Sequence, residues 1–147
     1  MDTTDGKILS ILQRDGRITM KALAQQINMS VPSAAERVRR LEEQRVILGY
    51  QAILDARALG REIETVILAA ARPQCEEQLR DFVRDCPDII EAWDLAGRVG
   101  LLLRISCRDM PAFQELVTKM QKFSTTESYL YLHHLKCGKI PVEIFSE

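Results

Sequence analysis

Residues 30–44 read SVPSAAERVRRLEEQ, a run of small residues followed by three arginines. At about 100° per residue of an α-helix, its apolar and polar positions separate onto opposite sides. The apolar side comprises Val31, Ala34, Val38 and Leu41, and the polar side comprises Ser33, Glu36, Arg37 and Arg40, with Arg39 on the flank. Ser30 suits the N-cap of this helix, and Pro32 suits its first turn. The stretch therefore predicts an amphipathic helix with an exposed polar side.

Two shorter helices are predicted before this one. Their apolar residues recur at helical spacing, at Ile8, Ile11 and Leu12 and again at Met20, Leu23, Ala24 and Ile27. Gly16 suits the end of the first helix, and Thr19 suits the N-cap of the second. Only Asn28 to Ser30 then separate the second helix from the third, which is the length of the turn in a helix-turn-helix. We therefore predict a helix-turn-helix domain over residues 1–50.

Positive charge is concentrated in this part of the chain. Residues 1–50 contain 8 Lys and Arg against 6 Asp and Glu, a net charge of +2, while the whole chain has a net charge of -1. Small residues at the start of the third helix would let it approach a duplex, and arginine can bond both phosphates and guanine edges. The predicted DNA contacts are Ser30, Pro32, Ser33, Glu36, Arg37, Arg39 and Arg40. The alternative is a solvated helix face with ordinary pairs, such as Glu36 with Arg40.

The second part of the chain has a different pattern. Residues 45–54 are rich in aliphatic side chains and predict a strand leaving the helical unit, and residues 51–61 form the linker strand and loop. Residues 62–147 then follow the order β-α-β-β-α-β, with strands expected at 63–72, 89–97, 100–107 and 127–135 and helices at 76–86 and 111–123. This order predicts an α+β fold with a ferredoxin-like sandwich at the C-terminus. Its helices cover one sheet face, so a partner subunit is expected on the other.

Several classes of function fit the sequence poorly. The segment after Met1 is polar and acidic, without the features of a secretory signal, and no apolar run is long enough to span a bilayer, so a cytoplasmic protein with no membrane partner is expected. Four separated cysteines predict reduced thiols, and His133 and His134 would point to opposite sides of a strand, so no metal or cofactor is predicted. Asp88, Glu91 and Asp94 suggest a solvated strand edge rather than paired catalytic carboxylates. No enzyme is predicted.

A set of short motifs runs through the chain: Asp2 and Asp5 before Ile8-Leu9, Asp15-Gly16-Arg17, Leu23-Ala24, Ser30, the run from Arg37 to Glu42, Ile47 with Gly49-Tyr50, Ala96-Gly97, and Lys136 followed by Ile140-Pro141. In these features the chain resembles the Lrp/AsnC family of bacterial and archaeal transcription regulators over nearly its whole length. This resemblance implies a winged N-terminal domain that binds double-stranded DNA and a C-terminal domain that forms dimers, commonly assembled to octamers. It further implies regulation of amino-acid metabolism genes and an amino-acid effector bound between dimers.

Two departures from the family pattern concern function. The winged segment often has glycine where this chain has Arg45, which adds a phosphate contact or is simply tolerated. The turn at the effector site often reads G-x-x-D, but here it is GRVG, with Gly100 in place of the acid. The candidate effector residues are Asp94, Gly97, Arg98, Val99 and Gly100, and the alternative is that both glycines serve turn geometry alone. An architectural DNA-binding protein without an effector is the competing function.

Overall fold

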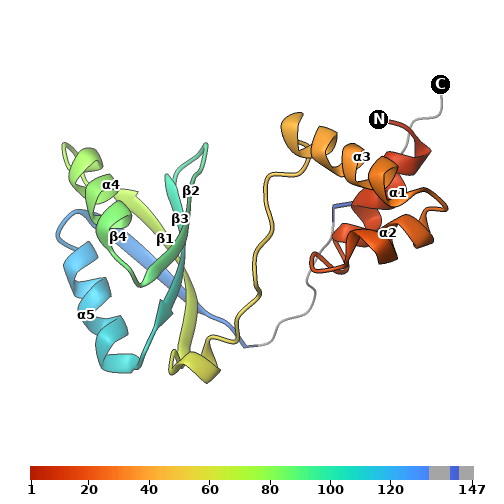
Figure 1. The fold of residues 1–147 in the computed structure, drawn as a ribbon. Helices are drawn as coiled ribbons and strands as arrows, with labels where there is room; N and C mark the ends of the chain where they lie inside the picture. Colours follow the sequence, from red (N-terminus) through yellow and green to blue (C-terminus); the bar gives the residue numbers. More distant parts are fainter. Residues whose placement is uncertain (133–139, 143–147) are drawn as a thin grey trace. The chain divides into compact units, whose positions relative to one another are not determined.

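The computed structural model describes residues 1–132 and 140–142, which divide into two compact units (Figure 1). The first unit contains residues 1–53, and the second begins at Leu54. Residues 140–142, which we expected in the second domain, belong to the first unit. The side-chain amide of Gln13 explains this position, because it donates to the carbonyl of Ile140 at 3.1 Å and accepts from its N–H at 2.9 Å.

The first unit is built on three helices: α1 (Thr3–Leu12), α2 (Met20–Gln26) and α3 (Val31–Glu43). The predicted apolar stripes meet at its centre, where Ile8, Leu23 and Leu41 are completely buried. Because each helix is short, this shared core rather than intrinsic propensity holds the helices in place. The predicted helix-turn-helix is confirmed.

Caps set the limits of these helices. The Thr19 hydroxyl accepts from the N–H of Ala22 at 3.2 Å, and the Ser30 hydroxyl accepts from the N–H of Ser33 at 3.3 Å, so both predicted N-caps are confirmed. The prediction that Gly16 ends the first helix is wrong, because α1 ends at Leu12 with Gln13 as its C-cap. Between α2 and α3, Asn28 takes the left-handed conformation at φ 55°, which asparagine tolerates better than most residues.

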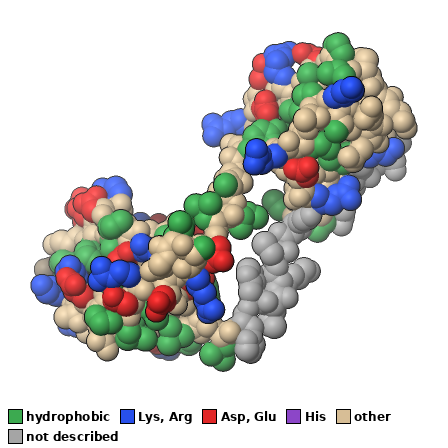
Figure 2. Space-filling model, turned by 60° about the horizontal axis from the view of Figure 1, so that its bottom comes forward, with side chains coloured by type: hydrophobic (Ala, Val, Ile, Leu, Met, Phe, Trp, Pro, Cys, Tyr) green, Lys and Arg blue, Asp and Glu red, His purple; other side chains and the backbone are tan. Residues whose placement is uncertain are grey.

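The predicted strand over residues 45–54 is not formed. The segment has no assigned helix or strand, and Leu48 and Ile53 expose 83% and 91% of their surfaces. A strand requires a neighbour for its N–H and C=O groups, and no strand in the described part of this chain lies beside the segment. The residues are apolar enough for a strand but have no neighbouring strand among residues 1–132 and 140–142. Hydrophobic side chains are visible along this segment, which joins the two units (Figure 2).

The second unit is a four-stranded antiparallel sheet with two helices. After a 3₁₀ turn (Arg57–Leu59) come β1 (Ile63–Ala71), α4 (Glu76–Asp85), β2 (Ile89–Asp94), β3 (Leu101–Cys107), α5 (Met110–Met120) and β4 (Ser124–Leu130). The strand order is β2-β3-β1-β4, and α4 and α5 cover the same sheet face (Figure 1). The ferredoxin-like fold is confirmed. β4 begins earlier than predicted, and the predicted positions 133–135, including His133 and His134, lie outside the described residues.

The two faces of this sheet differ in burial. Alternate residues of β1 and β3, such as Ile67, Leu103 and Ile105, are fully buried beneath the helices. On the opposite face, Leu68 pairs across the strands with Leu102, and both are only half-buried. Trp93 and Tyr129 on the flanking strands are 46% and 52% exposed. Within the described part of the chain, one apolar sheet face is therefore left open. Among the described residues, no helix is both long and apolar enough to span a membrane.

Candidate nucleic-acid interface

α3 buries one side and exposes the other, as its sequence predicts. Ala34, Val38 and Leu41 are buried in the core of the first unit. At the start of the helix, Pro32 and Ser33 are exposed, and the hydroxyls of Ser30 and Ser33 lie 2.8 Å apart. Apart from Val31, which is 42% exposed, the first turn therefore presents small side chains, and a duplex can approach the backbone there closely.

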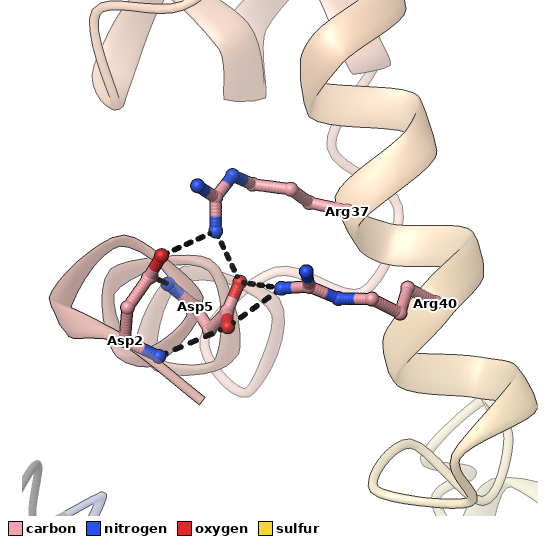
Figure 3. A network of polar contacts seen from close by, with 4 residues as sticks. All are labelled: Asp2, Asp5, Arg37 and Arg40. Atoms are coloured by element: carbon pink, nitrogen blue, oxygen red, sulfur yellow. Dashed lines mark hydrogen bonds and ion pairs between the residues drawn. The ribbon is translucent and has the colours of Figure 1, made fainter.

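Arg37 and Arg40 extend from α3 toward the first turn of α1 (Figure 3). Nη1 of Arg37 lies 2.7 Å from Asp2 and 2.8 Å from Asp5, while Nη2 of Arg40 lies 2.9 and 3.1 Å from the two oxygens of Asp5. The polar side of α3 is therefore not simply a solvated face, because Arg37 and Arg40 pair with two acids at the start of α1. Helical projection places side chains around one axis only, so it does not detect a second helix within reach of them.

Asp5 is the centre of this network and is only 1% exposed. It forms a reciprocal capping box with Asp2: the N–H of Asp5 donates to Asp2 at 2.8 Å, and the N–H of Asp2 donates to Asp5 at 3.0 Å. The backbone N–H of Asp5 and the guanidinium of Arg37 hold the pKa of Asp2 below its ordinary value. Oδ1 of Asp5 thus receives hydrogen bonds from Arg37 and Arg40, and Oδ2 receives them from Arg40 and the main-chain N–H of Asp2, which compensates for burying the charge.

The arginines keep unused donors after making these bonds. Among the bonds between described residues, Arg37 donates only through Nη1 and Arg40 only through Nη2. Nε and Nη2 of Arg37 therefore remain as a side-by-side pair, the fork that matches phosphate or guanine. The Arg37 and Arg40 side chains are 25% and 46% exposed, so a ligand can reach both.

Arg39 lies in a different environment from its neighbours. It forms ion pairs with Glu36 and Glu43 on the exposed surface of α3. Hydrogen bonding to Arg39 lowers the pKa of Glu36. Glu36 therefore pairs with Arg39 and not with Arg40, contrary to the alternative considered from the sequence. Because exposed pairs are weak, Arg39 and Glu36 can exchange partners readily.

Further cations of the first unit are exposed, and only Arg45 among them was considered for a phosphate contact from the sequence. They are Lys7, Arg14, Arg17, Lys21 and Arg45. On the face that Figure 2 shows, the Lys and Arg side chains of this unit are spread among hydrophobic and acidic ones. The positive charge of the first unit is therefore distributed over its surface and is not confined to α3.

The GRVG turn connects β2 to β3 in the second unit. Gly97 and Gly100 have φ values of 147° and 70°, a region that favours glycine, and the N–H of Leu95 donates to the carbonyl of Gly100 at 2.7 Å. Both glycines thus serve turn geometry, which does not exclude a ligand. Arg98 is exposed and Val99 is half-buried.

Asp94, the predicted acceptor for an effector ammonium, already has a partner. Arg80 of α4 donates to both of its oxygens at 2.8 Å, and this bond lowers the pKa of Asp94. The pair is exposed at 54% and 62%, so solvent and ligands have access to it. The structure therefore places Arg80 beside the candidate effector residues, a cation that the sequence analysis did not include.

Comparison with known proteins identifies the family. A model of winged helix-turn-helix DNA-binding domains matches residues 1–47, and a model of the Lrp/AsnC ligand binding domain matches residues 65–141. The chain is 34% identical over 143 residues to the leucine-responsive regulatory protein of Rhizobium meliloti, covering 92% of each protein. The chain belongs to the Lrp/AsnC family. LrpC of Bacillus subtilis has a similar solved structure, with a TM-score of 0.87, 25% identity and coverage of 94% of this chain and 99% of that one.

A second similar structure is a transcriptional regulator of Neisseria meningitidis solved as a complex with L-Met, with a TM-score of 0.86, 26% identity and 93% coverage of each chain. As a member of the Lrp/AsnC family, this chain is related to transcription regulators and carries their DNA-binding and ligand-binding domains. Asp2 and Asp5 entered the sequence analysis only as matches to the family. Two acids at the start of one predicted helix and two arginines on another could have suggested an ion pair between the helices. Helical spacing, however, relates residues within one helix and does not predict contacts between Asp5 and Arg37 or Arg40.

Proposed function

We propose that this chain is a sequence-specific DNA-binding regulator of transcription whose recognition helix is α3. The observation that supports the proposal is the combination of a small, exposed first turn with two arginines held by α1. The N-terminal residues Ser30, Pro32 and Ser33 approach the major groove, and Arg37 and Arg40 follow along the same side of the helix. Glu36 and Arg39 complete the proposed interface from the flank.

The proposed regulator acts as a dimer or a higher oligomer. A second copy would cover the open sheet face around Leu68 and Leu102, since an exposed apolar surface of this kind is rare in monomers. The unpaired segment 45–54 also needs a backbone partner. Two recognition helices related by a two-fold axis then read half-sites about 34–36 Å apart, or multiples of that distance, so the operator is palindromic. Further assembly to an octamer is part of the proposal.

We further propose that an amino acid modulates this regulator and that its targets include genes of amino-acid metabolism. The relative from Neisseria meningitidis was solved with L-Met, and the relative from Rhizobium meliloti is named for its response to leucine. In this chain the ligand would lie at the GRVG turn, where glycine amides and Arg98 suit its carboxylate. Asp94 suits its ammonium if the ammonium displaces Arg80.

A second candidate function is an architectural DNA-binding protein that needs no effector. Two observations favour it: Gly100 occupies the position of the usual acid, and Arg80 occupies both oxygens of Asp94. Neither function requires a reactive thiol. Burial raises the pKa of Cys107 to about 11, so this thiol stays protonated and is a poor nucleophile. The regulator and the architectural protein therefore remain the two functions to be separated by experiment.

Genomic footprinting with and without a mixture of amino acids tests the proposal. Protected sites should share a palindromic sequence, and occupancy should change when amino acids are added. A fragment carrying that sequence should bind the purified protein in the presence of excess unrelated DNA. Protection without a common sequence, unaffected by amino acids, would favour the architectural function, and the absence of saturable DNA binding would refute both.

A further inference from the structure

The carboxylate of Asp5 is buried, charged and shared between two arginines of α3. It is 1% exposed and receives hydrogen bonds from Arg37, Arg40 and the N–H of Asp2 (Figure 3). An acid at N3 of a capping box needs only the backbone N–H of the N-cap residue for its capping role, so the two guanidinium partners of Asp5 exceed that role. The carboxylate of Asp5 therefore holds the two arginines in place as well as the start of α1.

Holding an arginine before DNA arrives has an energetic consequence. A long side chain loses rotamer freedom when it binds, and fixing it in advance removes part of that loss. In the bonds that join described residues, Arg37 is held through Nη1, which leaves its Nε and Nη2 edge available, and Arg40 is held through Nη2. The bonds to Asp5 thus orient both guanidinium groups without using up their donors.

Whereas orienting the arginines strengthens binding to the operator, the negative charge of Asp5 weakens non-specific binding to DNA. A negative charge beside two arginines reduces the local positive potential, which is what attracts the DNA backbone irrespective of sequence. The same residue therefore favours oriented contacts and disfavours unoriented ones. These two effects together raise the ratio of specific to unspecific affinity.

We propose that Asp5 is a positioning residue for DNA recognition, which holds Arg37 and Arg40 in the orientation that reads the operator and suppresses unspecific binding. This inference rests on the proposed function and names the residue that gives its recognition helix selectivity. Asp2 contributes on the exposed side, through Arg37 only. Asp5 itself does not touch the DNA.

The test compares Asp5→Asn with two further variants of the full-length protein, Asp2→Asn as a partial loss of the network and Asp15→Asn as the control. Asparagine keeps the size of the side chain and removes its charge. Asp2→Asn removes a charge from the exposed edge of the network and keeps a good N-cap. Asp15→Asn removes a charge in the turn after α1, where the side chain accepts only from the N–H of Arg17 among the described residues. Each protein is titrated with operator DNA and with unrelated DNA at several salt concentrations.

For Asp5→Asn we expect operator affinity to fall by about tenfold, which is within the range for losing one bidentate base contact. Affinity for unrelated DNA should stay the same or rise, because the variant has lost a negative charge and its domain is more positive in net charge. Asp2→Asn should show a smaller loss in the same direction, and Asp15→Asn should leave the ratio of the two affinities unchanged. In an Arg37→Ala/Arg40→Ala background, Asp5→Asn should have no further effect on that ratio.

Other outcomes separate the inference from the function on which it rests. If the parent protein shows no preference for its footprinted sequence, the proposed function fails. If the parent shows the preference and Asp5→Asn retains it, the inference alone is wrong. Equal losses on both DNA types for Asp5→Asn would identify a purely structural residue and would also overturn the inference. Asp2→Asn, which retains the cap, decides the matter if Asp5→Asn does not fold.

Discussion

The carboxylate of Asp5 lies 2.9 Å from Nη2 of Arg40, which joins the first turn of α1 to the polar side of α3. A helix whose arginines are tied to a neighbouring helix differs from a helix with a solvated polar face. Its arginines contribute to the fold of the first unit and to the orientation of its surface at the same time. Substitutions there consequently affect stability and binding together.

Arg37→Ala and Arg40→Ala should each lower the free energy of unfolding by about 1–3 kcal/mol, because each leaves the buried Asp5 with a missing donor. The sequence alone predicts no such effect. Urea unfolding followed by helical circular dichroism measures it, with Arg39→Ala as the control, since Arg39 forms only exposed pairs. Equal stability of all three variants would show that the network contributes nothing. The same variants should also weaken operator binding.

Arg45→Gly should raise the free energy of unfolding by about 1 kcal/mol, because Arg45 has a φ of 56° and only glycine adopts this region without cost. Thermal unfolding of the two proteins checks the sign. The salt dependence of DNA binding then separates two roles of Arg45. A slope reduced by about one unit indicates a phosphate contact, and an unchanged slope indicates that the arginine is merely tolerated.

Gly100→Asp should strengthen the binding of an amino acid, since it supplies a carboxylate at the turn where the family often has one. Asp tolerates the φ of 70° better than most residues. Gly100→Ala is the matched control, because alanine adds a Cβ but no charge. This Cβ would lie 3.6 Å from the carbonyl oxygen of Ala69, which is an ordinary contact distance. Calorimetry against the twenty amino acids compares the variants. Tight binding of leucine by the parent, unaltered by changes at Asp94, Gly97, Arg98 and Gly100, would place the site elsewhere.

Leu68→Glu should shift the protein toward monomers, because it puts a charge at the centre of the open sheet face, opposite Leu102. Light scattering at micromolar concentration measures the mass of the particle. Leu59→Glu is the control: Leu59 is 63% exposed in the 3₁₀ turn, away from the sheet. A parent protein that is already monomeric would contradict the proposed assembly.

Asp109→Asn should destabilise the protein at neutral pH but not in acid. The N–H of Ala112 and the guanidinium of Arg108 hold the pKa of Asp109 below its ordinary value. A lowered pKa in the folded state adds stability above the unfolded pKa of about 3.9, and this stability is lost as the pH falls through the folded value. The difference in melting temperature between parent and variant should therefore be constant above about pH 5 and shrink below pH 4. A difference independent of pH would exclude the charge as its cause.

Local rules predicted the five helices and the four sheet strands of the described residues, although not all of their ends and not the state of residues 45–54. The helical spacing of apolar residues and the caps Thr19 and Ser30 are interactions within four residues, so they can be read directly from the sequence and were found in the structure. The same holds for the β-α-β-β-α-β order and for the open sheet face, because alternation along a strand assigns each side chain to a face. The family match in residues 1–50 likewise depends on sequence alone.

Only the tertiary structure decided which groups became partners. Asp5 and Arg40 are distant in sequence, and Arg80 of α4 pairs with Asp94 at the end of β2. Neither pair is predicted by the periodicity of a helix or a strand. Residues 45–54 have the composition of a strand and are not one here, since a strand exists only beside another strand. Helix formation depends on contacts within one turn, whereas ion pairs and sheet ladders depend on distances that the assembled fold creates.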